Sequence, residues 1–154
     1  MRRKFRLFKP IVDVVNNKKR KLEQIGIMEF KNFRNEHRGH LAPISVRAAF
    51  GPLPEKFVFA DQTESKEIVQ FENLKPIWMP GHDMYAMHFD GDRVRVSSTT
   101  NCKIFQTNEP AKKTVFQFGR DLNPHQYVLD YQFPLNAVQA FAICLSAMAP
   151  KMLQ

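Results

Sequence analysis

The sequence predicts a mainly β fold with a buried helix at the carboxy-terminal end, on two observations. Between residues 4 and 133, short segments rich in β-branched and aromatic residues alternate with turn residues at intervals of roughly 8 to 12, which is typical of an all-β barrel or sandwich. From Pro134 to Ala149 the chain is apolar on every side of a helix, and a helix without a polar face is normally buried. Phe141 and Ile143 are therefore expected to be nearly inaccessible.

The first half of the chain contains six of the expected strands. Residues 4–8 alternate charged with apolar side chains, and the others combine strand composition with an adjacent turn. Residues 16–21 are polar and basic and predict a solvated turn. Residues 31–42 are charged and lack apolar periodicity, so they predict a long exposed loop. The six strands are expected at residues 4–8, 11–15, 25–30, 44–50, 56–60 and 66–71.

The second half contains five expected strands and the helix. Strict alternation in residues 93–96 places Arg93 and Arg95 on one solvent-facing side. The expected strands cover residues 84–89, 93–96, 102–107, 114–118 and 126–133. Pro134 suits the first position of a helix, and Pro150 predicts its end. At about 1.5 Å per residue this helix is too short for a bilayer core of about 30 Å.

Composition narrows the location and the partners. The 154 residues are 44% hydrophobic, enough for one domain with a sizeable core. A net charge of +8 favours an acidic partner, either lipid headgroups or nucleic acid. Cys102 and Cys144 are expected to be reduced structural thiols, which favours an intracellular protein. The basic start, Met1 to Arg6, leads into no apolar stretch of signal-peptide length, so a cytosolic chain is expected.

Neither a metal site nor a catalytic site is predicted. His37 and His40, beside Glu36, could suggest a metal site, but no cysteine pair or third ligand lies near them. Zinc needs three or four ligands at set distances. His88 and Asp90 share one face of an expected strand, and no nucleophile motif accompanies them. The chain is therefore expected to be non-enzymatic, with no catalytic residues, metal or cofactor.

Three carboxy-terminal motifs resemble the signature of tubby-like proteins in order and spacing. They are Phe116-Gln-Phe-Gly-Arg120, Leu129-Asp-Tyr-Gln-Phe-Pro-Leu135 and Gln139-Ala-Phe-Ala-Ile-Cys-Leu-Ser146. The stretches Asn73-Leu-Lys-Pro-Ile-Trp78, 85–91, Arg93-Val94 and Lys103-Ile-Phe-Gln106 are similar to further elements of that family. Before residue 73 the resemblance rests on the strand rhythm and on Glu29, which stands in an apolar strand ahead of a basic loop.

The resemblance implies an antiparallel β-barrel around a central hydrophobic helix. The chain is shorter than a complete tubby domain and lacks its first strands, so residues 1–154 are expected to form a single tubby-like domain with an incomplete barrel. Such a barrel should have an open seam beside the helix. Unpaired strand edges at the seam would invite pairing with another chain.

The resemblance also implies phosphoinositide binding, particularly of phosphatidylinositol 4,5-bisphosphate. The family's Lys-x-Arg pair corresponds to Lys4 and Arg6, and Arg38 is the preferred candidate for its loop arginine, with Lys31 and Arg34 as alternatives. The implied role is a membrane-tethering adaptor in plasma-membrane or ciliary trafficking and signalling, cytoplasmic and peripheral at those membranes, with the nucleus and protein cargo as further options. The alternative is a basic nucleic-acid- or protein-binding module that kept the fold and lost lipid binding.

Overall fold

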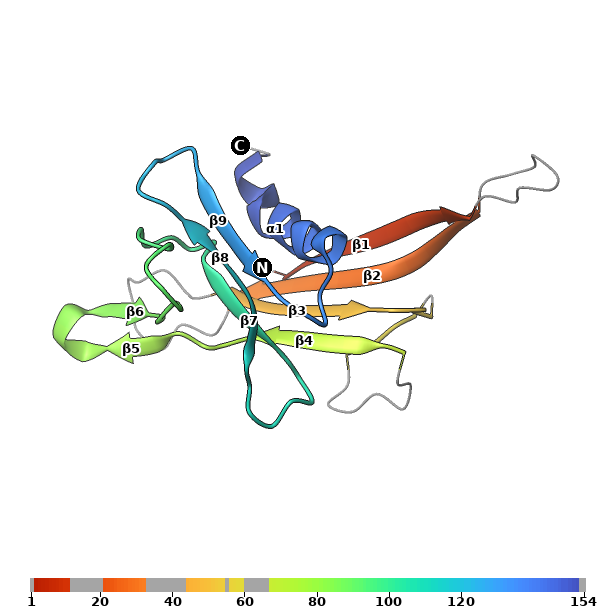
Figure 1. Cartoon of the computed structure of the whole chain (residues 1–154), viewed down its shortest axis with the longest axis horizontal. Coiled ribbons are helices and arrows are strands. Elements are labelled where there is room, and N and C mark those ends of the chain that lie inside the picture. The colour runs from red at the N-terminus through yellow and green to blue at the C-terminus, as the bar shows by residue number, and fades with distance from the viewer. Residues whose placement is uncertain (1, 12–20, 33–43, 55, 60–66, 153–154) are drawn as a thin grey trace.

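Seven antiparallel strands form one curved sheet, and α1 (Ala137–Met152) lies on its concave side (Figure 1). The computed structural model describes residues 2–11, 21–32, 44–54, 56–59 and 67–152. The strand order is β1-β2-β3-β4-β7-β8-β9, so β1 and β9 are the two edges among the strands described. The sheet is a half-barrel, which confirms the predicted mainly β fold with an incomplete barrel around a carboxy-terminal helix. Its strands are β1 (Arg2–Ile11), β2 (Lys21–Asn32), β3 (Ile44–Phe50), β4 (Val69–Asn73), β7 (Cys102–Gln106), β8 (Thr114–Arg120) and β9 (Tyr127–Tyr131).

In the sequence between β4 and β7, the chain forms a separate hairpin that projects from the sheet (Figure 1). It consists of β5 (Ile77–Met79) and β6 (Met84–Ala86), joined by a short 3-10 helix, Pro80–His82. The rings of Trp78 and Tyr85 meet edge to face with centroids 5.0 Å apart. This aromatic pair holds the two short strands together.

The concave face of the sheet carries the main core. Alternation along each strand sends one set of side chains inward, where Ala140, Ile143, Cys144 and Ala147 of α1 pack against them. The sheet contributes mainly aromatic and branched side chains, each of which is stabilised by about 1.5–3 kcal/mol when fully buried. They are Met28, Phe30, Val46, Phe50, Phe71, Ile104, Phe116 and Phe118.

Helix α1 begins and ends later than its prolines predict. The backbone N–H of Gln139 donates a hydrogen bond of 3.0 Å to the side-chain Oδ1 of Asn136. In return, the backbone N–H of Asn136 donates one of 3.0 Å to the side-chain Oε1 of Gln139. This reciprocal pair is a capping box, so the helix starts at Ala137 and not at Pro134. At the other end the helix continues to Met152, because a proline in the last turn removes only one backbone donor. Both predicted ends were wrong.

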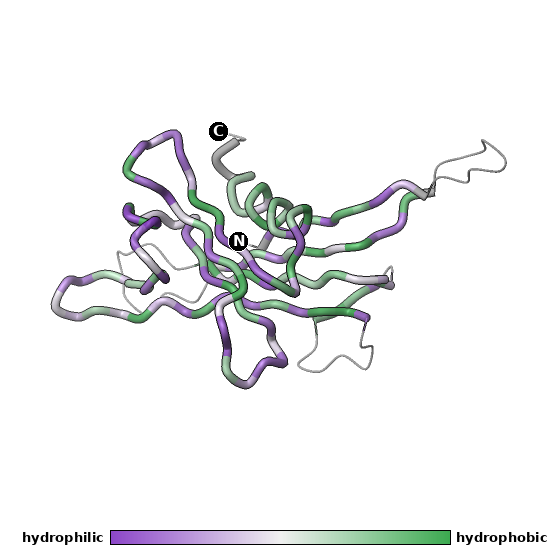
Figure 2. Tube along the Cα trace, viewed as in Figure 1, coloured by the Kyte–Doolittle hydropathy of each residue, from purple (hydrophilic) through white to green (hydrophobic). Residues whose placement is uncertain are grey.

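One side of α1 is exposed although it is apolar. Most of the tube of α1 has hydrophobic colours in Figure 2. Ile143 is fully buried, as expected, but Phe141 is 57% exposed. The prediction that Phe141 is inaccessible was wrong. The half-barrel covers only one side of the helix. The other side is equally apolar, so the exposure of Phe141 could not be predicted from the composition of the helix.

A second, smaller apolar cluster lies on the outer face of the sheet. Ile27 of β2 and Ala49 of β3 pack there against Leu53 and Phe57 from the following loop. Residues 56–59 of that loop form no strand, so the strand expected at 56–60 is wrong over its described part. The loop turns at Gly51, whose φ of 137° disfavours other residues, and a Cβ there would lie 2.4 Å from the Glu67 carbonyl oxygen.

Several other strand boundaries differ from expectation. β2 extends to Asn32, so Lys31 belongs to a strand and not to the loop expected at 31–42. Residues 33–42 of that expected loop lie outside the described residues, as do residues 12–15 of the strand expected at 11–15. β6 ends at Ala86, and residues 93–96 contribute only an isolated bridge between Val96 and Arg120. No helix among the described residues is long and apolar enough to cross a membrane.

Candidate functional site

The candidate site starts from the alternation along β1. Phe5 and Leu7 pack against the core on one side of this strand, and Lys4 and Arg6 are exposed on the other. Phe5 is fixed by an edge-to-face contact with Phe30, with ring centroids 5.8 Å apart. The structure therefore places Lys4 and Arg6 together on the outer face of the sheet, as their spacing predicts.

A row of alternating charges crosses the outer face from β1 to β4. Lys4 lies opposite Glu29 of β2, Glu29 lies opposite Arg47 of β3, and Arg47 lies opposite Glu72 of β4. Directly opposed residues of neighbouring strands project to the same face, where opposite charges attract. The register thus places a carboxylate between two cationic residues, Lys4 and Arg47.

Glu29 is the buried anchor of this row. Its side chain is only 3% exposed, and its carboxylate receives an ion pair from the Lys31 Nζ at 3.0 Å. A buried carboxylate is costly unless cations and hydrogen-bond donors compensate it. Lys31, two residues along the same strand, provides such compensation on the same outer face, where Lys4 lies opposite Glu29.

Lys4, Arg6, Lys31 and Arg47 together form what we call the basic face. Lys4 and Arg47 lie opposite the buried Glu29, Lys31 forms an ion pair with it, and Arg6 lies two residues from Lys4 on the same face of β1. These four cations outnumber the carboxylates of Glu29 and Glu72, so the local charge is positive. Lys4 and Arg6 are solvent-exposed donors, and an arginine fork suits a phosphate bidentately. The arrangement is chemically suited to a ligand that carries more than one phosphate.

Two of the predicted site residues are not described, and one described residue was missed. Arg34 and Arg38 lie outside the described residues, so their convergence with Lys4 and Arg6 stays a prediction. Arg47 was missed because its position opposite Glu29 depends on the register of β2 and β3. The available signal was its place as a lone cation between Val46 and Ala48 in an apolar strand.

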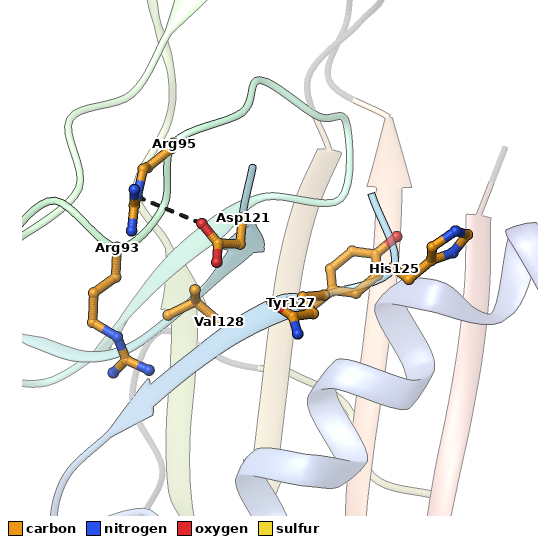
Figure 3. Close-up of a pocket in the computed structure, with 7 residues that line it drawn as sticks. Arg93, Arg95, Asp121, His125, Tyr127 and Val128 are labelled. Carbon is orange, nitrogen blue, oxygen red and sulfur yellow. Dashed lines mark ion pairs between the residues drawn. The ribbon is translucent and has the colours of Figure 1, made fainter. Parts of the chain in front are cut away.

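An open hollow of about 460 Å³ lies elsewhere, between the segment before β7 and the start of β9. Figure 3 shows Arg95 pointing toward Asp121, and their Nε and Oδ1 atoms are 3.5 Å apart. Arg93 is ion-paired with Asp130 of β9. Both arginines line this hollow, and each has an acidic partner. The strand from which their common face was predicted is not formed at 93–96. Each arginine of the hollow is thus balanced by one carboxylate, whereas the four cations of the basic face share two, Glu29 and Glu72.

A polar network fixes residues 90–93 against the sheet. The Gln117 amide exchanges hydrogen bonds with the backbone of Asp90 at 2.9 and 3.0 Å and also donates to Asp130 at 2.8 Å. The buried Lys103 ammonium donates to the Asp90 carboxylate at 2.9 Å, and this hydrogen bond lowers the pKa of Asp90 below its ordinary value. Asp90 is therefore held as an anion in a structural contact, which is unlike a proton-transferring group.

Both cysteines are free and buried. Burial raises the pKa of Cys144 to about 12 and that of Cys102 still further, so both thiols are unreactive at neutral pH. Over the described part of the chain, no cluster of three or more histidine, cysteine or acidic residues has the arrangement of a metal site. The cluster of Glu36, His37 and His40 lies outside that part.

Comparison with known proteins identifies the family. The model of the Tub family matches residues 3–149, nearly the whole chain. The chain belongs to the Tub family. The resemblance predicted from its carboxy-terminal motifs is thereby confirmed, and it extends over the amino-terminal strands that carry the basic face.

Relatives from animals and plants match this tubby-like chain. Mouse "Tubby-related protein 1" is 37% identical over 87 residues, which cover 56% of the chain and 16% of the relative. "Tubby protein homolog 1" of Caenorhabditis briggsae is 31% identical over 111 residues, 70% of the chain and 26% of the relative. Rice "Tubby-like F-box protein 6" is 32% identical over 95 residues, which cover 58% of the chain and 23% of the relative. The chain thus matches about a quarter or less of each relative's length.

Proposed function

We propose that this tubby-like chain is a non-enzymatic module that binds phosphoinositide headgroups, particularly phosphatidylinositol 4,5-bisphosphate. The observation that carries the proposal is the basic face, where the exposed Lys4 and Arg6 stand beside Lys31 and Arg47 around the buried Glu29. Membership in the Tub family supports it. We propose that Arg38, with Arg34 as the alternative, adds a further cation from the segment that follows β2 in the sequence.

The chemistry of the headgroup fits this surface. Phosphates on an inositol ring need several cationic donors, and the strand backbone fixes the spacing of Lys4 and Arg6 before any ligand arrives. Each charge-assisted contact contributes on the order of 1.5–3 kcal/mol. Additional basic residues near an anionic leaflet contribute about 1 kcal/mol each without specificity. Discrimination between lipids therefore depends on Lys4 and Arg6 more than on net charge.

The proposed cellular role is peripheral. We propose that residues 1–154 act as one tubby-like domain. This domain would tether protein cargo to the cytoplasmic side of the plasma or ciliary membrane, as an adaptor in trafficking and signalling. Release from the membrane would leave the chain in the cytoplasm or nucleus. No cofactor takes part.

The test is liposome sedimentation at fixed ionic strength. Vesicles containing the bisphosphate lipid are compared with phosphatidylserine vesicles of equal total charge. Arg6→Ala and Arg38→Ala are each expected to weaken binding to the bisphosphate vesicles about tenfold or more, since tenfold corresponds to about 1.4 kcal/mol. Lys113→Ala removes the same charge from an exposed position outside the basic face and should have little effect. Arg6→Lys should restore binding only in part, because lysine lacks the two-pronged donor geometry.

The alternative function gives different results. Equal losses for Arg6→Ala and Lys113→Ala, or equal binding to both vesicles, would indicate a diffuse basic surface and contradict the site. A DNA mobility-shift assay across salt concentrations then tests the nucleic-acid alternative, since non-specific DNA binding falls steeply as salt rises.

A further inference from the structure

The hairpin of β5 and β6 carries exposed apolar side chains on one of its two faces. Its register pairs Met79 with Met84, and Ile77, two residues before Met79, lies on the same face. The aromatic pair of Trp78 and Tyr85 lies on the other face. Ile77 is 71% exposed, Met84 43% and Met79 39%. We call these three side chains the hairpin face.

The hairpin face is not needed to hold the hairpin together. The edge-to-face contact of Trp78 and Tyr85 joins the two strands from the opposite face. The turn is closed by the Asp83 amide, which donates to the Pro80 carbonyl at 3.4 Å. None of the three residues of the hairpin face belongs to either apolar cluster of the described residues. Exposed apolar side chains gathered in this way are typical of an interaction surface.

The hairpin projects from the end of the sheet at which the basic face lies. Glu72, the last charge of the row that crosses the outer face, lies five residues before Ile77. An extended chain of that length spans at most about 18 Å. Figure 1 shows the hairpin continuing along the line of β4 beyond the end of the sheet. A broad surface that touches the basic face at this end can therefore reach the hairpin as well.

An anionic lipid bilayer is the surface that suits both parts. Its phosphates attract the basic face, and the boundary between its headgroups and acyl chains removes exposed apolar side chains from water. Tryptophan and tyrosine favour the same boundary, and Trp78 and Tyr85 lie on the neighbouring face of the hairpin. His82 and Asp83 at the turn are polar and exposed, so they limit the hairpin to this boundary and exclude deeper insertion. A protein groove would use the hairpin face alone and would not require the cations beside it.

We propose that the hairpin face is a second membrane contact, which inserts Ile77, Met79 and Met84 among the headgroups while the basic face binds a phosphorylated headgroup. This inference rests on the proposed function, because the headgroup brings the hairpin to the bilayer. Once the headgroup is bound, the second contact forms at a high effective concentration of lipid. The hairpin face therefore raises the affinity for vesicles and leaves the affinity for a free headgroup unchanged.

The first test uses the fluorescence of Trp78, which is the only tryptophan of the chain and therefore reports on the hairpin. The full chain is titrated with vesicles that contain phosphatidylinositol 4,5-bisphosphate. The emission is expected to move to shorter wavelength, and lipids brominated near the headgroup end of their acyl chains should quench it. Soluble inositol 1,4,5-trisphosphate presents phosphates without a bilayer and should leave the emission wavelength unchanged.

The second test compares vesicles with the free headgroup in variants of the chain. Ile77→Ser and Met79→Ser are each expected to weaken sedimentation with the bisphosphate vesicles about fivefold or more, because less apolar surface leaves water. Both should bind inositol 1,4,5-trisphosphate like the parent chain, which also shows that they fold. Leu22→Ser is the matched control, since Leu22 is 60% exposed but lies at the opposite end of β2 from Lys31, and it should change neither affinity. Arg6→Ala should lower both.

The outcomes separate this inference from the proposed function. If the parent chain binds the bisphosphate vesicles but the emission of Trp78 is neither shifted nor quenched, the hairpin does not insert and only this inference is overturned. Equal vesicle binding by Ile77→Ser and Leu22→Ser has the same meaning. Loss of inositol 1,4,5-trisphosphate binding in both hairpin variants would also overturn it, because the hairpin would then support the headgroup site itself. If the parent chain binds neither the vesicles nor the free headgroup, the proposed function fails together with this inference.

Discussion

The two sides of α1 are alike in composition but differ in environment. Ile143 and Ala140 on the sheet side are fully buried, and Phe141 and Val138 on the open side are more than half exposed. Both sides carry apolar residues, and most of α1 has hydrophobic colours in Figure 2. The difference comes from the strand order, in which β1 and β9 are the edges of the described sheet and the helix is covered from one side.

Because of this difference, the two sides of a single helix contribute unequally to stability. The buried side stabilises the fold through apolar area removed from water and through close packing. The exposed side removes less apolar area from water and is expected to add little to stability. The predictions below test that inequality, in order of decreasing effect.

The largest effect is expected on the buried side. Ile143→Ala removes a side chain with no exposed surface from the centre of the core, so it should lower the free energy of unfolding by about 2–5 kcal/mol through lost burial and an unfilled cavity. Urea unfolding followed by circular dichroism measures this. A loss below about 1 kcal/mol would contradict the packing of α1 on the sheet.

A smaller effect is expected at the start of the helix. Asn136→Ala removes the side-chain acceptor for the Gln139 amide and should cost about 1 kcal/mol. Asn136→Ser keeps a capping oxygen and should recover most of this loss. If Asn136→Ser were as unstable as Asn136→Ala, the capping box would not account for where α1 begins.

On the open side, Phe141→Ala should change stability by less than about 1 kcal/mol. The ring is more than half exposed, and the better helix propensity of alanine, roughly 0.5 kcal/mol, offsets part of the lost contact. The same denaturation experiment compares it with Ile143→Ala. A loss equal to that of Ile143→Ala would mean that the open side is covered.

The smallest effect concerns pH. The hydrogen bond from Lys103 lowers the pKa of Asp90 in the folded chain, so this contact stabilises the fold above the unfolded carboxyl pKa of about 3.9 and is lost as pH falls through the lower folded value. Asp90→Asn should reduce stability by less than about 1 kcal/mol above pH 4–5, because the carboxylate is largely exposed, and by less still toward pH 2. Asp92→Asn is the control for a nearby exposed carboxylate. If the difference in the free energy of unfolding between Asp90→Asn and the parent chain grew as pH falls, it would contradict a stabilising contact of the Asp90 carboxylate.

Local features of the fold could be predicted because local chemistry determines them. The strand at residues 44–50 has the predicted bounds, and the burial of Ile143 was also predicted. The capping box was visible in the sequence as Asn136 and Gln139, but Pro134 was a competing start signal. The exposure of Phe141 could not be predicted, because it depends on which strands are present to cover the helix.

The candidate site was predictable only where it lies on one strand. Lys4 and Arg6 are two residues apart, and side chains two residues apart in any β-strand point to the same face. Lys31 was identified but assigned to a loop, and Arg47 was missed, because both positions depend on how β1, β2 and β3 align. The buried Glu29, unusual in an apolar strand, was the signal that neighbouring cations must converge there.

Thiol labelling of α1 under native conditions tests the open half-barrel most directly. Phe141→Cys and Ile143→Cys are each treated with a water-soluble maleimide near neutral pH, where the native Cys144, its pKa raised to about 12, should react slowly. The thiol at position 141 is expected to react almost as fast as in the unfolded chain, and the thiol at position 143 orders of magnitude more slowly, since its reaction requires opening of the core. Equal protection of both thiols would show that the helix is enclosed on all sides and would contradict the account.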